Sequence, residues 1–362
     1  MIQNERLISF GILGCGHSAR IRKRCLITHF MMKGLNINKR QLGKDGFNIG
    51  EVGLGCWQFG GDFGHMDEDT AISIMATAVA NNVNFFDTAD VYGSGRSEEL
   101  IGRFLKGCST QVTVATKFGR SGNVYPDNYS EAALRNSVEG SLKRLGRDCI
   151  DLLQLHCIPT DILRTGEVFD WLRRLKQEGL LKHFGASVET VEEGLLCIEQ
   201  DELLSLQVIF NIFRQKLVTE LLPQAKAKGI GIIARLPLAS GLLTGKFSKD
   251  TKFTETDHRN FNRDGQFFNV GETFAGLPFG VGVALTDKIK KLLPENMSMP
   301  QLALRWILDH DAVSVIIPGA SSPEQARGNA AISDLTPLPE ELHQALSDLY
   351  ANSIFQHIRG PY

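Results

Sequence analysis

The sequence predicts an α/β fold of the (β/α)8 class, a TIM barrel, in residues 35–362. Eight short apolar runs rich in β-branched residues alternate with stretches of helical periodicity, at a spacing of roughly thirty residues. Such a barrel takes about 250 residues, and a chain of 362 residues is long enough for it. The alternative is an open doubly wound sheet, which normally carries a phosphate-binding loop after its first strand. The segment Gly55-Cys56-Trp57-Gln58 is not such a loop, so the barrel is favoured.

Residues 1–34 are expected to be an N-terminal extension, either disordered or not part of the native protein. Residues 6–19 contain a strand-like run followed by Gly11, Gly14 and Gly16, which resembles the start of a dinucleotide-binding unit. No second strand or acidic residue follows at the distance that such a unit needs. A lipoprotein-type signal ending at Cys15 is an alternative, although its apolar stretch is short.

The barrel domain is expected to open with a β-hairpin. In residues 39–49, Asp45-Gly46 lies between two extended runs, which is typical of a tight turn. The strand candidates that follow are residues 51–57, 83–88, 112–117, 149–156, 182–187, 205–211, 230–235 and 313–318.

The segments between these strands predict helices. Ile72, Met75 and Val79 repeat at helical spacing, and Ser130 is a plausible N-cap for a helix over 131–145. Further helical segments are expected around residues 171–175 and 217–222, and a last helix over 339–350 precedes the tail 352–362.

Residues 246–280 interrupt the alternation after the seventh strand. The segment is polar and charged, with interspersed phenylalanines, and it predicts an insertion within a single catalytic domain. Long loops that follow barrel strands often shape or cover the active site, although a mobile surface loop is an equal alternative.

The composition is that of an ordinary globular protein, with 43% hydrophobic and 22% charged residues. A formal net charge of −2 argues against bulk affinity for nucleic acid or for an anionic membrane. The seven cysteines show neither CxxC pairs nor a metal-like spacing with histidines, which favours reduced thiols over disulfides or a metal site. We therefore expect a cytoplasmic protein, monomeric or a small homo-oligomer, that binds neither nucleic acid nor membrane and holds no metal.

Titratable residues stand where consecutive predicted strands end. The second strand ends at Asp87, the third at Lys117 and the fourth at His156, and Tyr92 lies in the loop after Asp87. Taken alone, a residue of any of these types at a strand end more often has a structural role than a catalytic one. Because all strand ends of a parallel barrel meet at its C-terminal face, however, the four side chains are expected to share one pocket.

These four residue types suit proton transfer to a carbonyl oxygen. Lys117 would lower the pKa of Tyr92, Asp87 would balance the lysine charge, and His156 would orient a carbonyl. Carbonyl reduction also needs a hydride, which no side chain supplies, so a nicotinamide cofactor is implied.

In this order, the motifs FFDTADVYGSGRSEELIGRFL, VATKFG, DLLQLH and FGAS resemble those of the aldo-keto reductases. The resemblance runs from about residue 38 to residue 330 and includes the opening GLGCWQFGG. It implies a barrel enzyme in which Tyr92 is the general acid and base, Lys117 and Asp87 tune it, and His156 orients the substrate. The enzyme would interconvert an aldehyde, ketone or sugar carbonyl and its alcohol.

The resemblance also implies a set of cofactor ligands. Ser187 and Gln207 would hold the nicotinamide carboxamide, although Val188 stands where the family usually has Asn. Arg235 takes the position of an aromatic residue that stacks on the nicotinamide. The remaining implied ligands are Gly55, Cys56, Trp57, Leu236, Leu238, Ser240, Gly241, Leu242, Gly319, Ser321, Gln325 and Asn329.

The resemblance implies NADPH as the cofactor. NADH remains possible, because the segment 319–329 carries fewer basic residues than many relatives have there. Trp57, Phe118 and the insertion are candidates for the substrate pocket, with a core role equally open for Phe118. Two other functions remain open. One is a cofactor-binding sensor similar to the potassium-channel β-subunits; the other is a metal-dependent hydrolase, ranked last because the His-x-His ligand pattern is missing.

Overall fold

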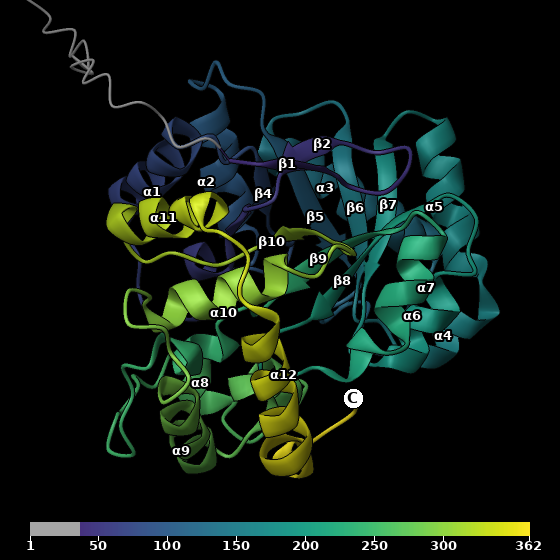
Figure 1. Cartoon of the computed structure of the whole chain (residues 1–362). Coiled ribbons are helices and arrows are strands. Elements are labelled where there is room, and N and C mark those ends of the chain that lie inside the picture. The colour runs from purple at the N-terminus through teal and green to yellow at the C-terminus, as the bar shows by residue number, and fades with distance from the viewer. Residues whose placement is uncertain (1–36) are drawn as a thin grey trace, which may run out of the picture. The chain divides into compact units, whose positions relative to one another are not determined.

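The computed structural model describes residues 37–362. In this part of the chain eight parallel strands form one sheet in the order β10-β9-β8-β7-β6-β5-β4-β3. Bridges between Val52 and Ile316 and between Gly55 and Gly319 join the two edges, so the sheet closes into a barrel. Helices lie around the strands (Figure 1). The predicted fold class is therefore confirmed.

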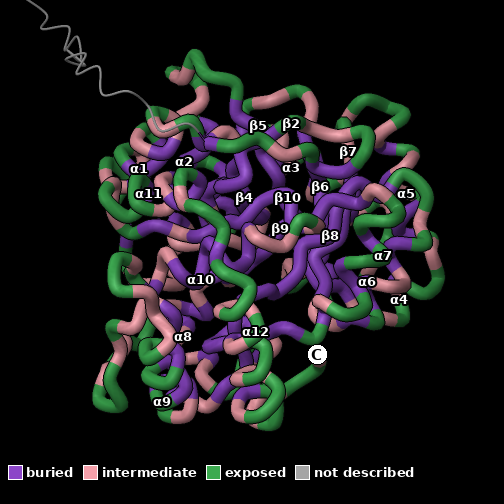
Figure 2. Tube along the Cα trace, viewed as in Figure 1, coloured by how far each residue is buried: buried purple, intermediate pink, exposed green. Residues whose placement is uncertain are grey.

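Each of the eight strand candidates overlaps a strand of the barrel, and three strands extend one or two residues beyond the predicted bounds. The bounds are β3 (Leu54–Gly55), β4 (Phe85–Asp87), β5 (Thr113–Phe118), β6 (Ile150–His156), β7 (Leu181–Ser187), β8 (Leu203–Ile209), β9 (Gly231–Arg235) and β10 (Val313–Ile316). Their residues are buried almost throughout, as Figure 2 shows. Burial on both faces explains why these strands appear in the sequence as continuous apolar runs.

The N-terminal hairpin is present as β1 (Lys39–Gln41) and β2 (Asn48–Gly50), which pair antiparallel. Leu42 and Ile49 belong to a core cluster with strand residues such as Phe85 and Leu152. The hairpin therefore contributes two apolar side chains to this part of the core.

The helix predicted over 131–145 is α3 (Glu131–Leu145), and the Ser130 side chain accepts a hydrogen bond from Ala133 N as its N-cap. The other helices are α1 (Glu68–Ala80), α2 (Arg96–Leu105), α4 (Thr160–Thr165), α5 (Glu167–Gln177), α6 (Val191–Cys197), α7 (Leu221–Ala227), α8 (His258–Phe261), α9 (Phe279–Lys290), α10 (Met299–Leu308), α11 (Pro323–Ala330) and α12 (Glu340–Leu349).

The segment after β9 is packed onto the domain. Phe247, Phe253, Phe274 and Phe279 contact one another through their rings, with centroids 4.9 to 6.1 Å apart. The Ser240 hydroxyl donates to Glu272 O and accepts from Phe274 N. These contacts hold the insertion in place over the loop that follows β9.

The dinucleotide-like glycines at 11, 14 and 16 and the possible signal ending at Cys15 lie outside the described residues. Within the described part of the chain, no helix combines the length and the apolar character needed to cross a bilayer.

Candidate active site

The register of the sheet brings the polar strand ends together. Lys117 lies opposite Gln154, the next strand places His156 opposite Ser187, and Ser187 in turn lies opposite Gln207. Because neighbouring parallel strands end at nearly the same height, their terminal side chains meet at the mouth of the barrel.

Lys117 is at the centre of the first cluster. Its Nζ donates to Asp87 Oδ1 at 2.6 Å, to Thr88 O at 2.7 Å and to Tyr92 Oη at 3.3 Å. Burial lowers the pKa of Lys117, but the charges of Asp87 and Tyr92 outweigh it, and the pKa is raised overall. The lysine therefore remains a cation although its side chain is fully buried.

Asp87 is held from its other side by two glutamines. Its Oδ2 accepts from Gln207 Nε2 at 2.7 Å and from Gln154 Nε2 at 3.1 Å. The carboxylate is thus hydrogen-bonded through both oxygens, which fixes its orientation toward Lys117. Gln154 is part of this arrangement and was not expected from the sequence.

Tyr92 departs from one expectation. Its pKa is raised to about 12, because burial outweighs the lowering effect of the Lys117 charge. The sequence predicted that Lys117 brings the pKa of Tyr92 below its usual value. The charge of Lys117 does lower this pKa, but the prediction is wrong for the overall shift, which is upward. The phenol is protonated at neutral pH, which is the form that donates a proton.

His156 lies beside Tyr92, with ring centroids 5.9 Å apart. Burial lowers the pKa of His156 well below its ordinary value, and Arg120, Lys117 and Arg235 lower it further. The imidazole is therefore neutral. Its Nδ1 is buried and lacks a hydrogen-bond partner among the described residues, while the residue itself lines the cavity beside Tyr92.

A cavity of about 370 Å³ opens beside these residues. Of the expected cofactor ligands, those that line it are Gly55, Cys56, Trp57, Ser187, Gln207, Arg235, Leu236, Leu238, Ser240, Gly241, Gly319, Ser321 and Gln325. Two expected ligands have other positions. Leu242 is buried in the hydrophobic core, and the Asn329 side chain donates to Gly319 O at 3.2 Å, which supports the loop behind the cavity.

Arg235 and Ser240 have polar contacts of their own at this cavity. Arg235 Nη1 lies 3.7 Å from Glu272 Oε1, while its buried Nε has no hydrogen-bond partner within residues 37–362. Ser240 Oγ is engaged with the backbone of the insertion, and Ser240 and Gly241 have φ of 54° and 98°. This backbone bends in the left-handed region, so the loop is preformed along the cavity wall.

A second cavity of about 460 Å³ adjoins the first and shares Trp57, Tyr92, His156 and Glu272 with it. Its remaining lining residues are Asp62, Val91, Arg120, Tyr125, Glu189, Phe267, Phe268, Asn269 and Pro361. Phe267 is 74% exposed and Tyr125 is 47% exposed, so aromatic rings also reach the solvent here. Together the cavities form a site that extends on both sides of Tyr92 and His156.

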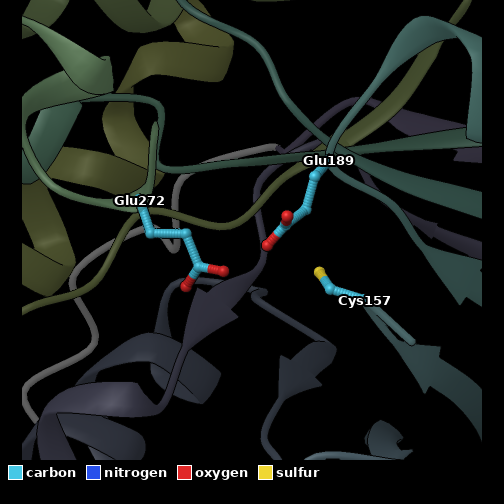
Figure 3. Close-up of side chains that lie close together, drawn as sticks. All are labelled: Cys157, Glu189 and Glu272. Atoms are coloured by element: carbon cyan, nitrogen blue, oxygen red, sulfur yellow. The ribbon is translucent and has the colours of Figure 1, made fainter. Parts of the chain in front are cut away.

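A charged cluster forms part of the lining of the second cavity. Arg120 Nη2 is 2.6 Å from Glu189 Oε1, and Arg120 Nη1 is 2.7 Å from Glu272 Oε1. Burial and the charge of Glu272 raise the pKa of Glu189, whereas Arg120 and Arg235 outweigh burial and lower that of Glu272. Figure 3 shows both carboxylates pointing toward one another and toward Cys157.

The model of the Aldo/keto reductase family matches residues 51–351. The chain belongs to this family. The aldo-keto reductase YhdN of Bacillus subtilis is 31% identical over 321 residues, which cover 87% of this chain and 94% of the relative. The NADH-specific methylglyoxal reductase of Escherichia coli is 29% identical over 319 residues, which cover 82% of this chain and 93% of the relative. The solved glycerol dehydrogenase of Gluconobacter oxydans has a TM-score of 0.71 and 30% identity over 90% of this chain and 97% of its own.

Several residues that line the cavities of this aldo-keto reductase were not named individually from the sequence. They are Gln58, Phe63, Pro237, Thr244, Lys246, Phe247, Arg259, Glu272, Ile317 and Pro318 at the first cavity and most of the lining of the second. Among those of the first cavity, Lys246, Phe247, Arg259 and Glu272 carried a signal, because they lie in the insertion 246–280, which was expected near the site. Phe118 is fully buried in the core and packs against the ring of Tyr129, so for it the core alternative holds.

Proposed function

We propose that this aldo-keto reductase uses NADP(H) to interconvert an aldehyde, ketone or sugar carbonyl and the corresponding alcohol. The observation that carries the proposal is the chain of contacts from Asp87 through Lys117 to Tyr92, at the point where two cavities meet. A half-buried phenol in contact with a buried ammonium is suited to move a proton to and from a ligand.

Each member of the tetrad has a separate task in this proposal. Tyr92 donates its hydroxyl proton to the carbonyl oxygen during reduction and takes it back during oxidation. Lys117 stabilises the phenolate that this transfer leaves, and Asp87 keeps Lys117 charged. Neutral His156, which lines both cavities, donates a hydrogen bond to the same oxygen.

The first cavity suits a dinucleotide. Ser187 and Gln207 present polar side chains at the end nearest Tyr92, and the loop over 235–241 and the segment 319–325 continue the wall. When bound there, a nicotinamide would supply the hydride. Besides Arg235, which is expected at the nicotinamide, the described lining contains the basic residues Lys246 and Arg259. These two favour NADPH with its extra phosphate, while the NADH-specific relative keeps NADH open.

The deciding experiment is a cofactor-absorbance assay with a panel of aldehydes, ketones and sugars, with NADPH and with NADH. Turnover that Tyr92→Phe abolishes would support the enzyme. Cofactor binding without turnover of any compound would instead favour the sensor alternative. No structural observation favours that alternative, because the tetrad is assembled.

We further propose a single catalytic domain over 35–362, with residues 1–34 dispensable, in a cytoplasmic monomer or small homo-oligomer. The described residues 37–362 belong to one compact unit, and Cys56, Cys157 and Cys197 are buried free thiols. A variant lacking residues 1–34 should keep its turnover. Light scattering after size exclusion gives the oligomeric state, and fractionation of cells gives the location.

A further inference from the structure

The second cavity holds more carboxylate than cationic charge. Its charged lining residues, within the described chain, are Asp62, Glu189 and Glu272 against Arg120. Arg120 lies between Glu189 and Glu272, with one guanidinium nitrogen close to each. Its charge is therefore already matched by two acidic partners and is not available to a further anion.

Glu189 is rigidly placed in this wall. One carboxylate oxygen meets Arg120 and the other accepts a hydrogen bond from the Asn269 side chain. Its backbone N–H also donates to Glu193, at the start of α6. A side chain held by two partners, on a backbone that is itself hydrogen-bonded, presents its remaining lone pairs to the cavity in a fixed orientation.

The same cluster could be taken for a cation site. Ligand atoms of Cys157, Glu189 and Glu272 lie within 4.8 Å of one another (Figure 3). Two guanidinium groups already supply the positive charge that these carboxylates need, however. Arg120 contacts both carboxylates, and Arg235 lies 3.7 Å from Glu272. Burial also raises the pKa of the Cys157 thiol to about 11, which disfavours the thiolate that a metal would need.

We propose that Glu189 sets the substrate class: the site accepts uncharged carbonyl compounds that carry a hydroxyl group and rejects those that carry a carboxylate or phosphate. The inference rests on the proposed function, because it assumes that the carbonyl lies against Tyr92 and His156, which line the same cavity as Glu189. A substrate hydroxyl can donate to the Glu189 carboxylate. A substrate anion would instead meet like charges with no unmatched cation in the described lining.

Two aromatic aldehydes of similar size test this inference. For the wild-type protein, kcat/KM should be at least about tenfold higher for 4-(hydroxymethyl)benzaldehyde than for 4-carboxybenzaldehyde, because like charges repel strongly at a partly buried site. Glu189→Gln should reduce this ratio severalfold, mainly by improving turnover of the carboxylated compound. Glu199→Gln is the matched control, because Glu199 pairs with Lys228 on the surface and precedes β8, away from the strand ends.

A preference for 4-carboxybenzaldehyde in the wild type, or a ratio that Glu189→Gln leaves unchanged, would overturn the inference. Glu189 lines the second cavity and not the first, so titration with NADPH, followed by cofactor fluorescence, verifies that the variant still folds. If no compound of the wider panel were turned over, the proposed function would fail. The affinities of the two aldehydes for the NADPH-loaded protein would still show whether Glu189 discriminates between them.

Discussion

Lys117 and Asp87 form an ion pair of 2.6 Å in which the lysine side chain is fully buried and that of the aspartate is 4% exposed. A buried pair of this kind contributes little net stability, because desolvation offsets the attraction, but removal of one partner leaves an uncompensated charge. The presence of this buried pair is therefore better explained by the contact of Lys117 with Tyr92, whose hydroxyl lies 3.3 Å from the lysine Nζ.

Lys117→Met should lower kcat by at least about a hundredfold, because the phenolate of Tyr92 would lose its stabilising charge. Cofactor affinity should change little, since Lys117 is not among the residues that line the first cavity. Steady-state kinetics and a fluorescence titration with NADPH measure the two quantities. Lys228→Met, at an exposed pair with Glu199, is the control. Retention of normal activity in Lys117→Met would show that the tetrad is wrongly assigned.

Gly319→Ala should weaken cofactor binding several-fold, because a Cβ at this position would come within 1.6 Å of Gln58 Nε2. Both residues line the first cavity, so displacement of the Gln58 side chain would alter its wall. The double variant Gly319→Ala with Gln58→Ala should recover much of the affinity. Isothermal titration with NADPH measures all three proteins. Wild-type affinity in the single variant would refute this account of the contact.

The fold was readable from the sequence because local signals agreed with one another. Buried parallel strands give continuous apolar runs, and a capped helix such as 131–145 shows both its N-cap and its apolar face. Consecutive strand ends also placed Asp87, Lys117 and His156 together, because topology alone requires this in a barrel.

Other parts of the site could not be derived in this way. Arg120, Glu189 and Glu272 come from three segments far apart in the sequence, and the folded insertion brings Glu272 to Arg120. The net shift of the pKa of Tyr92 depends on how deeply its ring is buried, which no local pattern specifies. Helix α2 also escaped prediction, since Gly95 and not a side-chain cap precedes it.

The two reaction directions should differ in their dependence on pH. Burial raises the pKa of Tyr92 to about 12 and lowers that of His156 well below its usual value. Over about pH 6 to 9 both groups therefore keep one protonation state, and kcat/KM for reduction should be flat. Oxidation needs Tyr92 to accept a proton, so its rate should rise with pH toward the pKa. Reduction that fell steeply above about pH 8 would contradict the raised pKa.

Tyr362→Ala should destabilise the domain by about 2–3 kcal/mol, because the ring packs against a buried cation. The Arg214 guanidinium lies 3.9 Å from the centroid of Tyr362, and the Tyr362 hydroxyl accepts from Lys216 N at 2.9 Å and meets Tyr350 Oη at 2.8 Å. Without the ring, buried Arg214 would keep its charge with fewer neighbours to stabilise it.

Urea denaturation followed by circular dichroism measures this loss. Tyr125→Ala is the matched control, since Tyr125 is 47% exposed and should change the unfolding free energy by less than about 1 kcal/mol. The pKa of Arg214 is lowered to about 10 by burial, with Tyr362 raising it in opposition. If wild type and Tyr362→Ala had equal urea midpoints, the Arg214 cation would be stabilised by the rest of its surroundings and not by Tyr362.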